Sequence, residues 1–335
     1  MNGIQAPDAL LAVEDLRVAF AVGGREVRAV DGVSYVVGPG KTLAIIGESG
    51  SGKTVGCRAI MGLLPAGTSI SGSARLRGTE MIGLNDSEMR RHRGQDMAMI
   101  FQDPSRSLNP TMRVGVQITE AIRTHRKVDR SEARVQAIEL LRLVRIPAAE
   151  RRFHEYPHQL SGGMRQRIMI AMALACRPKL LIADEATTAL DVTTQAQIME
   201  LLLELQAELG MALILISHDL GLAASYADEV VVMYAGKIVE QAPARRLFGA
   251  GGTVKMRYTR ALLDAIPHLE RAAHTELPVV GGRPPDPTAL PVGCSFAPRC
   301  PAAADDCMVE EPALTEHAAG HRWACYHPCE NGVSA

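Results

Sequence analysis

Residues 47–54 read Gly47-Glu48-Ser49-Gly50-Ser51-Gly52-Lys53-Thr54 and match the pattern G-x-x-x-x-G-K-[ST]. In this pattern the glycines allow backbone N–H groups to turn inward around phosphate oxygens. We expect Lys53 to reach the β- and γ-phosphates of ATP and the Thr54 hydroxyl to ligate Mg²⁺. A helix that opens at Lys53 adds the positive end of its dipole. The predicted nucleotide ligands are Gly47, Ser49, Gly50, Ser51, Gly52, Lys53 and Thr54.

Strands and helices alternate on both sides of this loop. A short apolar strand (41–46, KTLAII) runs into it, and a helix (55–64) leaves it and ends before Pro65. Alternation of this kind predicts an α/β fold with a largely parallel sheet. The other predicted elements are strands at 11–19, 27–37, 97–101, 180–183 and 212–216, a helix at 194–208, and a hairpin of 230–234 with 237–239.

A long helical stretch, 111–159, interrupts the alternation and predicts an inserted subdomain. Beyond Phe248 the chain becomes rich in glycine, proline and loops, too poor in apolar residues for a large core of its own. The predicted division is 1–102 for the first part of the core, 103–160 for the helical subdomain, 161–248 for the second part of the core, and 249–335 for a cysteine-containing extension.

The strand at 180–183 ends in two carboxylates, Asp184 and Glu185. Residues at the carboxyl end of a parallel strand face the ligand crevice. Asp184 suits the Mg²⁺ shell, and Glu185 is then free to polarise an attacking water as a general base. Gln102 and His218 also follow predicted strands. Taken alone, that glutamine carries almost no signal, and a histidine at a strand end is typical of a surface residue.

The segment 160–167 (LSGGMRQR) opens a strongly apolar helix. Ser161 is a candidate N-cap, and Gly162 and Gly163 follow it. Bare N–H groups and a helix dipole make this a second place where an anion could bind. On its own, however, the segment favours a simple capped turn.

The overall composition excludes several classes of protein. The 335 residues carry a net charge of −1, whereas nucleic-acid binders usually show a basic stripe. The short cluster of Arg90, Arg91 and Arg93 is typical of a solvated helix face. No apolar run approaches the ~20 residues that span a bilayer, and the first residues lack the pattern of a signal peptide. We therefore expect a cytoplasmic protein that meets membranes only through partners.

Together and in this order, the motifs resemble those of the ABC-type ATPases, over roughly residues 10–245. The segment 160–167 is similar to the signature motif of that family. The resemblance implies a P-loop (RecA-like) ABC ATPase core with an inserted helical subdomain, an N-terminal antiparallel β part and a loop-rich C-terminal extension. It also implies that two such domains enclose two ATP molecules head to tail.

The resemblance assigns further roles in the bound state. Ser161, Gly162 and Gly163 are expected at the nucleotide held by the partner's loop. Gln102 is expected to sense nucleotide and Mg²⁺ and to touch transmembrane subunits, and His218 to position the γ-phosphate and water. Asp191 of the segment 189–191 (ALD) is expected at the dimer contact. Phe20 stands where the family places an aromatic ring on adenine, although a phenylalanine in a strand is ordinarily core.

Nearly the whole chain resembles the dipeptide/oligopeptide importer ATPases, in segments such as MAMIFQDPSRSLNPTMRVGVQI, YPHQLSGGMRQR and MYAGKIVE. The implied partners are a second ABC ATPase subunit, expected to be a different chain, two transmembrane permeases and an extracytoplasmic solute-binding protein, with no nucleic acid. The implied place is the cytoplasmic face of the inner or plasma membrane. Nickel and glutathione importers of this subfamily, and a non-transport ABC ATPase, are the alternatives. Ala186 departs from the proline usual after the catalytic glutamate.

Five of the seven cysteines lie beyond residue 290. Disulfides are rare in the cytoplasm, so this clustering indicates metal binding or free thiols. Four thiolates suit a [4Fe–4S] cluster, which the resemblance also implies, while Cys325 and Cys329 are close enough in sequence to keep zinc open. His317, His321 and His327 are alternative ligands. The predicted cluster ligands are Cys294, Cys300, Cys307 and Cys325.

Overall fold

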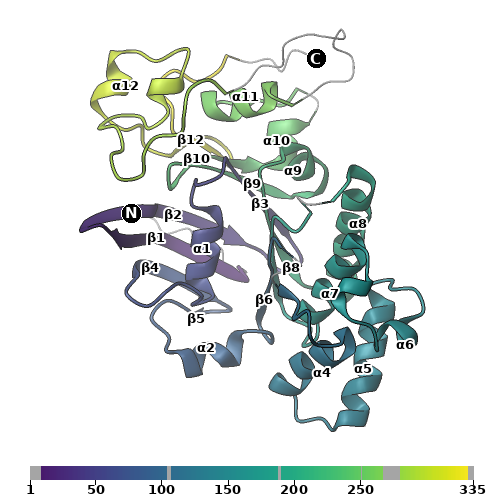
Figure 1. Ribbon diagram of the computed structural model, residues 1–335. Coiled ribbons are helices and arrows are strands. Elements are labelled where there is room, and N and C mark those ends of the chain that lie inside the picture. Colours follow the sequence, from purple (N-terminus) through teal and green to yellow (C-terminus); the bar gives the residue numbers. More distant parts are fainter. Residues whose placement is uncertain (1–8, 104–106, 188–189, 250, 267–279, 331–335) are drawn as a thin grey trace.

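Two β-sheets form the framework of the protein, seen here in a computed structural model (Figure 1). The structure describes residues 9–103, 107–187, 190–249, 251–266 and 280–330. Helix α1 (Lys53–Ile60) packs against strands β1 and β2 of the smaller sheet. In the chain, α1 comes directly after the loop that leaves the central strand of the larger sheet. The predicted α/β class is confirmed. No helix among the described residues is both long enough and apolar enough to cross a membrane.

The smaller sheet is antiparallel and has the order β2-β1-β4-β5. Its strands are β1 (Leu11–Val22), β2 (Arg25–Val37), β4 (Ser69–Leu76) and β5 (Thr79–Glu80). A turn at Gly23–Gly24 joins β1 to β2, and both glycines have positive φ, 56° and 75°. Strands β4 and β5 were not predicted, because the alternation in β4 (SISGSARL) is weakened by glycine and serine and β5 has only two residues.

The larger sheet has the order β11-β12-β10-β9-β3-β8-β7-β6. Its parallel part runs from β9 through β3 and β8 to β7 and β6, and β10, β12 and β11 continue it antiparallel. The strands are β3 (Thr42–Ile46), β6 (Met97–Ile100), β7 (Leu180–Asp184), β8 (Ala212–Ser217), β9 (Glu229–Tyr234), β10 (Lys237–Pro243), β11 (Thr315–Ala318) and β12 (His321–Trp323).

The predicted helical stretch is three helices, α4 (Val114–His125), α5 (Arg130–Leu143) and α6 (Ala149–Arg152), at the lower right of Figure 1. It stands between β6 and β7 in the chain. The other helices are α2 (Asp86–His92), α7 (Gly162–Ala173), α8 (Val192–Leu209), α9 (Leu220–Tyr226), α10 (Ala244–Phe248), α11 (Arg257–Asp264) and α12 (Asp305–Val309), with short 3₁₀ turns at Pro157–Gln159 and Ala297–Arg299.

Among the described residues, three apolar cores hold these layers together. One face of the parallel strands, with Leu43, Ile45 and Ile182, packs toward the smaller sheet and α1. The other face meets α7, α8 and the helical subdomain at β6–β8, and α9, α10 and α11 at β3 and β9. The strands are buried on both faces, which explains their continuous apolar sequences.

The extension is loop-rich, as predicted, yet it is not separate from the core. Strand β12 pairs with β10, so the extension lengthens the main sheet. Phe296 is 2% exposed and packs with Tyr234 and Tyr258. Between β10 and β12, the buried Glu240 Oε1 is hydrogen-bonded to His321 Nε2 at 2.9 Å. The apolar contacts that the extension lacks internally are therefore made with the core.

Candidate nucleotide-hydrolysis site

The loop of residues 47–54 leaves β3 between β8 and β9 and turns tightly against its neighbours. Gly47 has φ 156°, and a Cβ atom there would lie 2.2 Å from the carbonyl oxygen of Met233. Gly52 has φ 97°, and a Cβ atom there would lie 2.3 Å from the carbonyl oxygen of Ala29. Only glycine fits at these two positions. The close approach of backbone to backbone fixes where the loop N–H groups lie.

Lys53 is buried inside this loop. Its ammonium donates to the carbonyl oxygens of Gly47 and Glu48, at 2.6 and 2.8 Å, and more weakly to Ser51 Oγ at 3.3 Å. Burial lowers the pKa of Lys53, although the carboxylates of Glu185, Asp184 and Glu48 oppose the shift. A buried ammonium whose nearest acceptors are neutral is well suited to receive an anion such as a phosphate.

Asp184 and Thr54 meet at the end of β7. The Thr54 hydroxyl donates to Asp184 Oδ1 at 2.6 Å, and Arg58 lies 3.6 Å from Oδ2. The Asp184 side chain is 3% exposed, and desolvation raises its pKa despite the hydrogen bond from Thr54. A hydroxyl and a desolvated carboxylate in contact are the oxygen donors that Mg²⁺ prefers beside a nucleotide. These two residues fit a magnesium site.

Glu185 occupies a strained backbone position. Its φ is 47°, in the left-handed region that non-glycine residues rarely adopt, and its N–H donates to the Ile216 carbonyl at 3.0 Å. Gln102 Nε2 donates to Glu185 Oε2 at 2.7 Å, and His218 Nδ1 lies 3.7 Å from Oε1. Two residues that follow two other strands thus converge on the Glu185 carboxylate. That arrangement orients a general base.

A single cavity of about 390 Å³ joins these groups. Its lining brings together most of the residues predicted from sequence, and adds Ala29 and Val55. The predicted residues on its wall are Ser49, Gly50, Ser51, Gly52, Lys53, Thr54, Gln102, Glu185 and His218. Asp184 does not line the cavity itself, but it is hydrogen-bonded to the lining residue Thr54. The predicted Mg²⁺ ligand Gln102 contacts Glu185 here, and its metal contact stays a prediction.

Several predicted residues, Gly47 among them, do not line this cavity. Phe20 is partly buried in β1 and packs on the core between the two sheets, so its stacking on adenine stays a prediction. Ser161 caps α7, with its hydroxyl accepting from the Met164 N–H at 3.3 Å, and Gly162 and Gly163 form the first turn. Their predicted contacts with nucleotide also remain predictions.

Asp191 caps α8, and its carboxylate accepts from the Thr194 N–H and hydroxyl, at 2.9 and 2.8 Å. The hydrogen bond from the Thr194 N–H is the main cause of its lowered pKa. A capping role therefore accounts for the aspartate in this structure, and its predicted dimer contact stays a prediction. Ala189, in the same predicted segment, is outside the described residues.

The four predicted cysteine ligands gather in the extension. The Cys294 N–H donates to the Cys307 carbonyl at 2.8 Å. Burial raises the pKa of Cys294, with Cys307 and Cys300 adding to the shift, and burial raises that of Cys325 to about 11, with Cys294 and Cys300 adding to it. Binding of a shared metal by the four cysteines stays a prediction.

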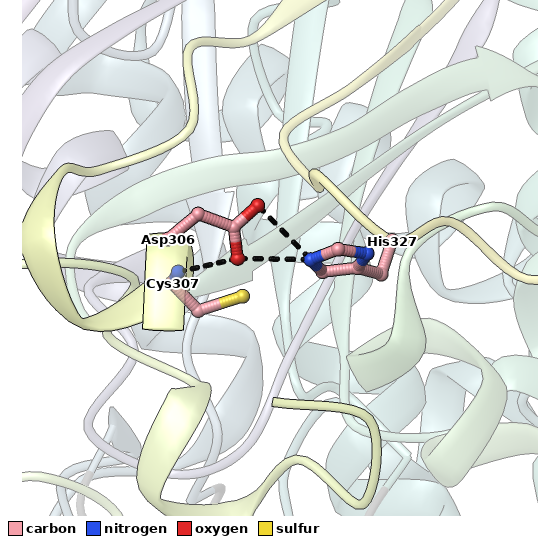
Figure 2. A group of neighbouring side chains, drawn as sticks. All are labelled: Asp306, Cys307 and His327. Carbon is pink, nitrogen blue, oxygen red and sulfur yellow. Dashed lines mark hydrogen bonds and ion pairs between the residues drawn. The ribbon is translucent and has the colours of Figure 1, made fainter. Parts of the chain in front are cut away.

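Figure 2 shows that Cys307 also belongs to a second group of side chains that could bind a metal, together with Asp306 and His327. Asp306 and His327 point toward each other, with His327 Nε2 at 2.9 and 3.0 Å from the two carboxylate oxygens. The ligand atoms of Asp306, Cys307 and His327 lie within 4.8 Å of one another. A carboxylate, a thiol and an imidazole are also the donor types that bind zinc.

Some residues that were not predicted from the sequence contact Glu48 of the loop or Asp184. Arg299 of the extension binds Glu48 through two hydrogen bonds, and the Tyr258 hydroxyl accepts from the Glu48 N–H at 2.8 Å. Arg58 approaches Asp184 from α1. No local pattern marks these residues, because their partners lie up to 251 positions away in the chain.

Two family models match the sequence. The model described as ABC transporter matches residues 30–188, and the one described as Oligopeptide/dipeptide transporter, C-terminal region, matches 239–307. Among solved structures, the chain resembles a dimeric ATP-binding cassette in a post-hydrolysis state bound to ADP and Pi, with a TM-score of 0.63 and 26% identity, over 70% of this chain and 99% of that one. It also resembles CbiO1 of Clostridium perfringens, part of an ABC transporter complex, with a TM-score of 0.62 and 29% identity, over 72% and 91% of the two chains.

Curated relatives are more similar. The oligopeptide transport ATP-binding protein OppD of Escherichia coli is 48% identical over 326 residues, which are 97% of this chain and 95% of that one. The dipeptide transport ATP-binding protein DppD of E. coli is 49% identical over 324 residues, 96% and 98% of the two chains. OppD of Mycobacterium tuberculosis is 48% identical over 94% of this chain, which spans about half, 51%, of that longer relative.

Proposed function

Because this chain belongs to the ABC transporter ATPases, in their oligopeptide/dipeptide transporter branch, we propose that it hydrolyses ATP to drive peptide import. The observation that carries the proposal is the convergence of Lys53, the Thr54–Asp184 pair and Glu185 on one cavity. A regulatory module that only binds nucleotide has no need for a glutamate held in a strained, oriented position beside that cavity. Peptide import itself rests on the likeness to the named peptide transport proteins.

In the proposed reaction, each residue acts on the groups that surround it. Lys53 leaves the loop carbonyls and neutralises the phosphates. Thr54, Asp184 and Gln102 would hold Mg²⁺, which would withdraw charge from the transferring phosphoryl group. Glu185 takes a proton from the attacking water, and Gln102 orients its carboxylate. His218, on the other side of Glu185, positions water and the γ-phosphate. Hydrolysis then needs no covalent intermediate on the protein.

We further propose that ATP is enclosed between two ATPase domains arranged head to tail. The signature residues Ser161–Gly163 do not line the cavity of their own chain among the described residues, so they are free to serve a partner's site. A dimeric solved relative supports such pairing. We expect the partner to be a different ATPase chain. The predicted four-part division, with 103–160 as an inserted subdomain, belongs to this proposal.

The proposed membrane partners are two permease subunits, served by a solute-binding protein outside the cell. A groove of about 210 Å³ lies between the core and the helical subdomain and is lined by Phe101, the chain neighbour of Gln102. Leu63 and Phe101 on its rim are 37% exposed, which suits an apolar segment of a permease. Its lining includes Met61, Leu63, Arg93, Phe101, Ala121, His125, Met172 and Cys176. The protein would then work as a peripheral subunit at the cytoplasmic face.

The test is ATP hydrolysis and solute uptake by the complex purified with its permeases. We expect ATP turnover, and uptake of labelled di- or oligopeptide that Glu185→Gln abolishes. The exposed Glu208 at the end of α8 supplies the matched control, Glu208→Gln, which should keep both activities. Uptake of nickel or glutathione in place of peptide would replace the solute assignment. Absence of ATP turnover from the wild-type complex would overturn the proposal.

We also propose a metal centre in the extension, a [4Fe–4S] cluster held by Cys294, Cys300, Cys307 and Cys325. The clustering of these cysteines in one loop-rich segment and the hydrogen bond between Cys294 and Cys307 support it, and its role would be structural. Anaerobically purified protein should be brown and contain about four iron and four sulfide per chain. Cys300→Ser should remove the brown colour. Cys176→Ser is the control: Cys176 follows α7 and lies outside the extension, so its loss should leave the colour unchanged. A colourless protein with one zinc would instead favour the Asp306–Cys307–His327 group.

A further inference from the structure

Arg299, next to Cys300 in the extension, reaches the phosphate-binding loop. Its guanidinium donates to both carboxylate oxygens of Glu48, at 2.7 and 2.9 Å. The same group donates to the Tyr234 hydroxyl at 3.2 Å and to the carbonyls of Gly281 and Val280, at 2.7 and 3.2 Å. The Arg299 side chain is only 3% exposed. A buried, bidentate pair of this kind fixes the direction of both partners.

Aromatic rings hold the arginine in place from the core side. The guanidinium carbon lies 5.8 and 5.9 Å from the ring centres of Tyr234 and Phe296. Tyr258 packs on both rings, with centroids 4.5 and 5.4 Å away, and its hydroxyl accepts from the Glu48 N–H at 2.8 Å. The side chain and the N–H of Glu48 are therefore both bound by one rigid cluster.

Glu48 in turn contacts Lys53 of the nucleotide site. Its carbonyl accepts from Lys53 Nζ at 2.8 Å and from the Ser51 N–H at 3.2 Å. A rotation of the Glu48 peptide would move an acceptor of Lys53 and a bond within the loop. The extension also lies along the same side of the loop, because Pro284, Pro285 and Pro287 line a pocket of about 370 Å³ with residues 48–51.

We propose that Arg299 is a positioning residue for the nucleotide site. By holding Glu48, it keeps the phosphate-binding loop in the shape that receives ATP, and so it couples docking of the cysteine-bearing extension to nucleotide affinity. The inference rests on the proposed ATP binding of this chain. Coupling free energies are reciprocal, so bound ATP must also stabilise the docked extension.

The experiment measures the ATP affinity of the full chain and the KM and kcat of its complex. Arg299→Met should raise the Kd and KM for ATP about tenfold, a typical effect for a hydrogen-bonded charge, and change kcat much less. Arg299→Lys, which keeps the charge and loses the fork, should fall between. The matched control is Glu311→Gln, which breaks another ion pair between extension and core, that of Glu311 with Lys237, without touching the loop.

Arg299→Met removes several donors from a buried site and can undock the extension, so Glu48→Gln tests the same pair from the loop. It should raise KM similarly, and the double variant should be no worse than either single change. In the wild type, ATP should slow proteolysis of residues 294–300, and Arg299→Met should remove that protection. Unchanged ATP affinity in both single variants, with wild-type binding intact, would overturn the inference. Absence of ATP binding by the wild type would instead overturn the proposed function.

Discussion

At the scale of single residues, the two adjacent carboxylates of the site have different surroundings. The Asp184 side chain is 3% exposed and that of Glu185 is 17% exposed. Asp184 receives one hydroxyl hydrogen bond, from Thr54, whereas Glu185 is approached by Gln102 and His218. The first is suited to hold a cation and the second to move a proton. Each role gives its own prediction.

Asp184→Asn should stabilise the nucleotide-free protein. Burial raises the pKa of Asp184 above its ordinary 3.8, so the folded state holds the proton longer than the unfolded state does. The stability of the wild type therefore falls as pH rises from about 4 through the raised pKa, and asparagine escapes this loss. Thermal unfolding at pH 7 should show a higher Tm for the variant, and the difference should shrink toward pH 4. Mg²⁺ with ATP should stabilise only the wild type.

Glu185→Gln should bind ATP and hydrolyse it far more slowly. Loss of a general base typically slows a reaction ~10²–10⁴-fold. Glutamine keeps the shape and can still meet Gln102, so nucleotide affinity should change little. Single-turnover hydrolysis and nucleotide binding in the complex measure the two effects. A variant that turned over ATP at the wild-type rate would rule out Glu185 as the base.

At the scale of elements, the junction of β10 and β12 joins the extension to the main sheet. Glu240 on β10 is fully buried, and its Oε1 interacts with His321 of β12 and accepts from the Lys255 N–H at 2.7 Å. Trp323, the one tryptophan in the sequence, is 9% exposed there and stacks on His317 at 4.1 Å between ring centres. Its fluorescence therefore reports directly on docking.

His321→Leu should loosen the extension, because it leaves the buried Glu240 carboxylate without one of its partners. Such a loss costs about 1–3 kcal/mol. Trp323 emission should shift to the red at a lower temperature than in the wild type, and protease should cut the extension sooner. The double change Glu240→Leu with His321→Leu replaces the pair by apolar groups and should recover much of the loss. No difference between the single variant and the wild type would refute this account of the junction.

At the scale of the whole molecule, the proposed head-to-tail pairing separates two kinds of damage. Lys53→Ala should abolish tight ATP binding at the site of its own chain. Ser161→Arg should leave that binding intact and block hydrolysis at the site shared with the partner, since Ser161 caps α7 away from its own cavity. Nucleotide binding by the isolated chain and hydrolysis by the complex distinguish the two. Weakened binding by the isolated Ser161→Arg chain would contradict the pairing.

Much of this architecture could be predicted from sequence because its signals are local. Strands β3, β7 and β8 are nearly continuous apolar runs, and each leads directly into residues of the site, namely the phosphate-binding loop, Asp184 with Glu185, and His218. The contacts that escaped prediction are distant in the chain. Strand β12 has three residues and is defined by pairing with β10, and Arg299 meets Glu48 from 251 positions away. Neither has a periodicity of its own to reveal it.

The position of β3 in the middle of the main sheet has a consequence for biosynthesis. Leu43 on β3 pairs with Ile214 on β8 and Glu229 on β9, so both neighbours of this strand leave the ribosome long after it does. At ~5–20 residues per second, the delay is roughly 10–35 s. The strands of the smaller sheet are all synthesised once residue 80 has emerged, while the apolar strand that carries the phosphate-binding loop still lacks both of its partners. Nascent chains halted before residue 212 should therefore engage chaperones through residues 42–46, and release them once β8 and β9 have emerged.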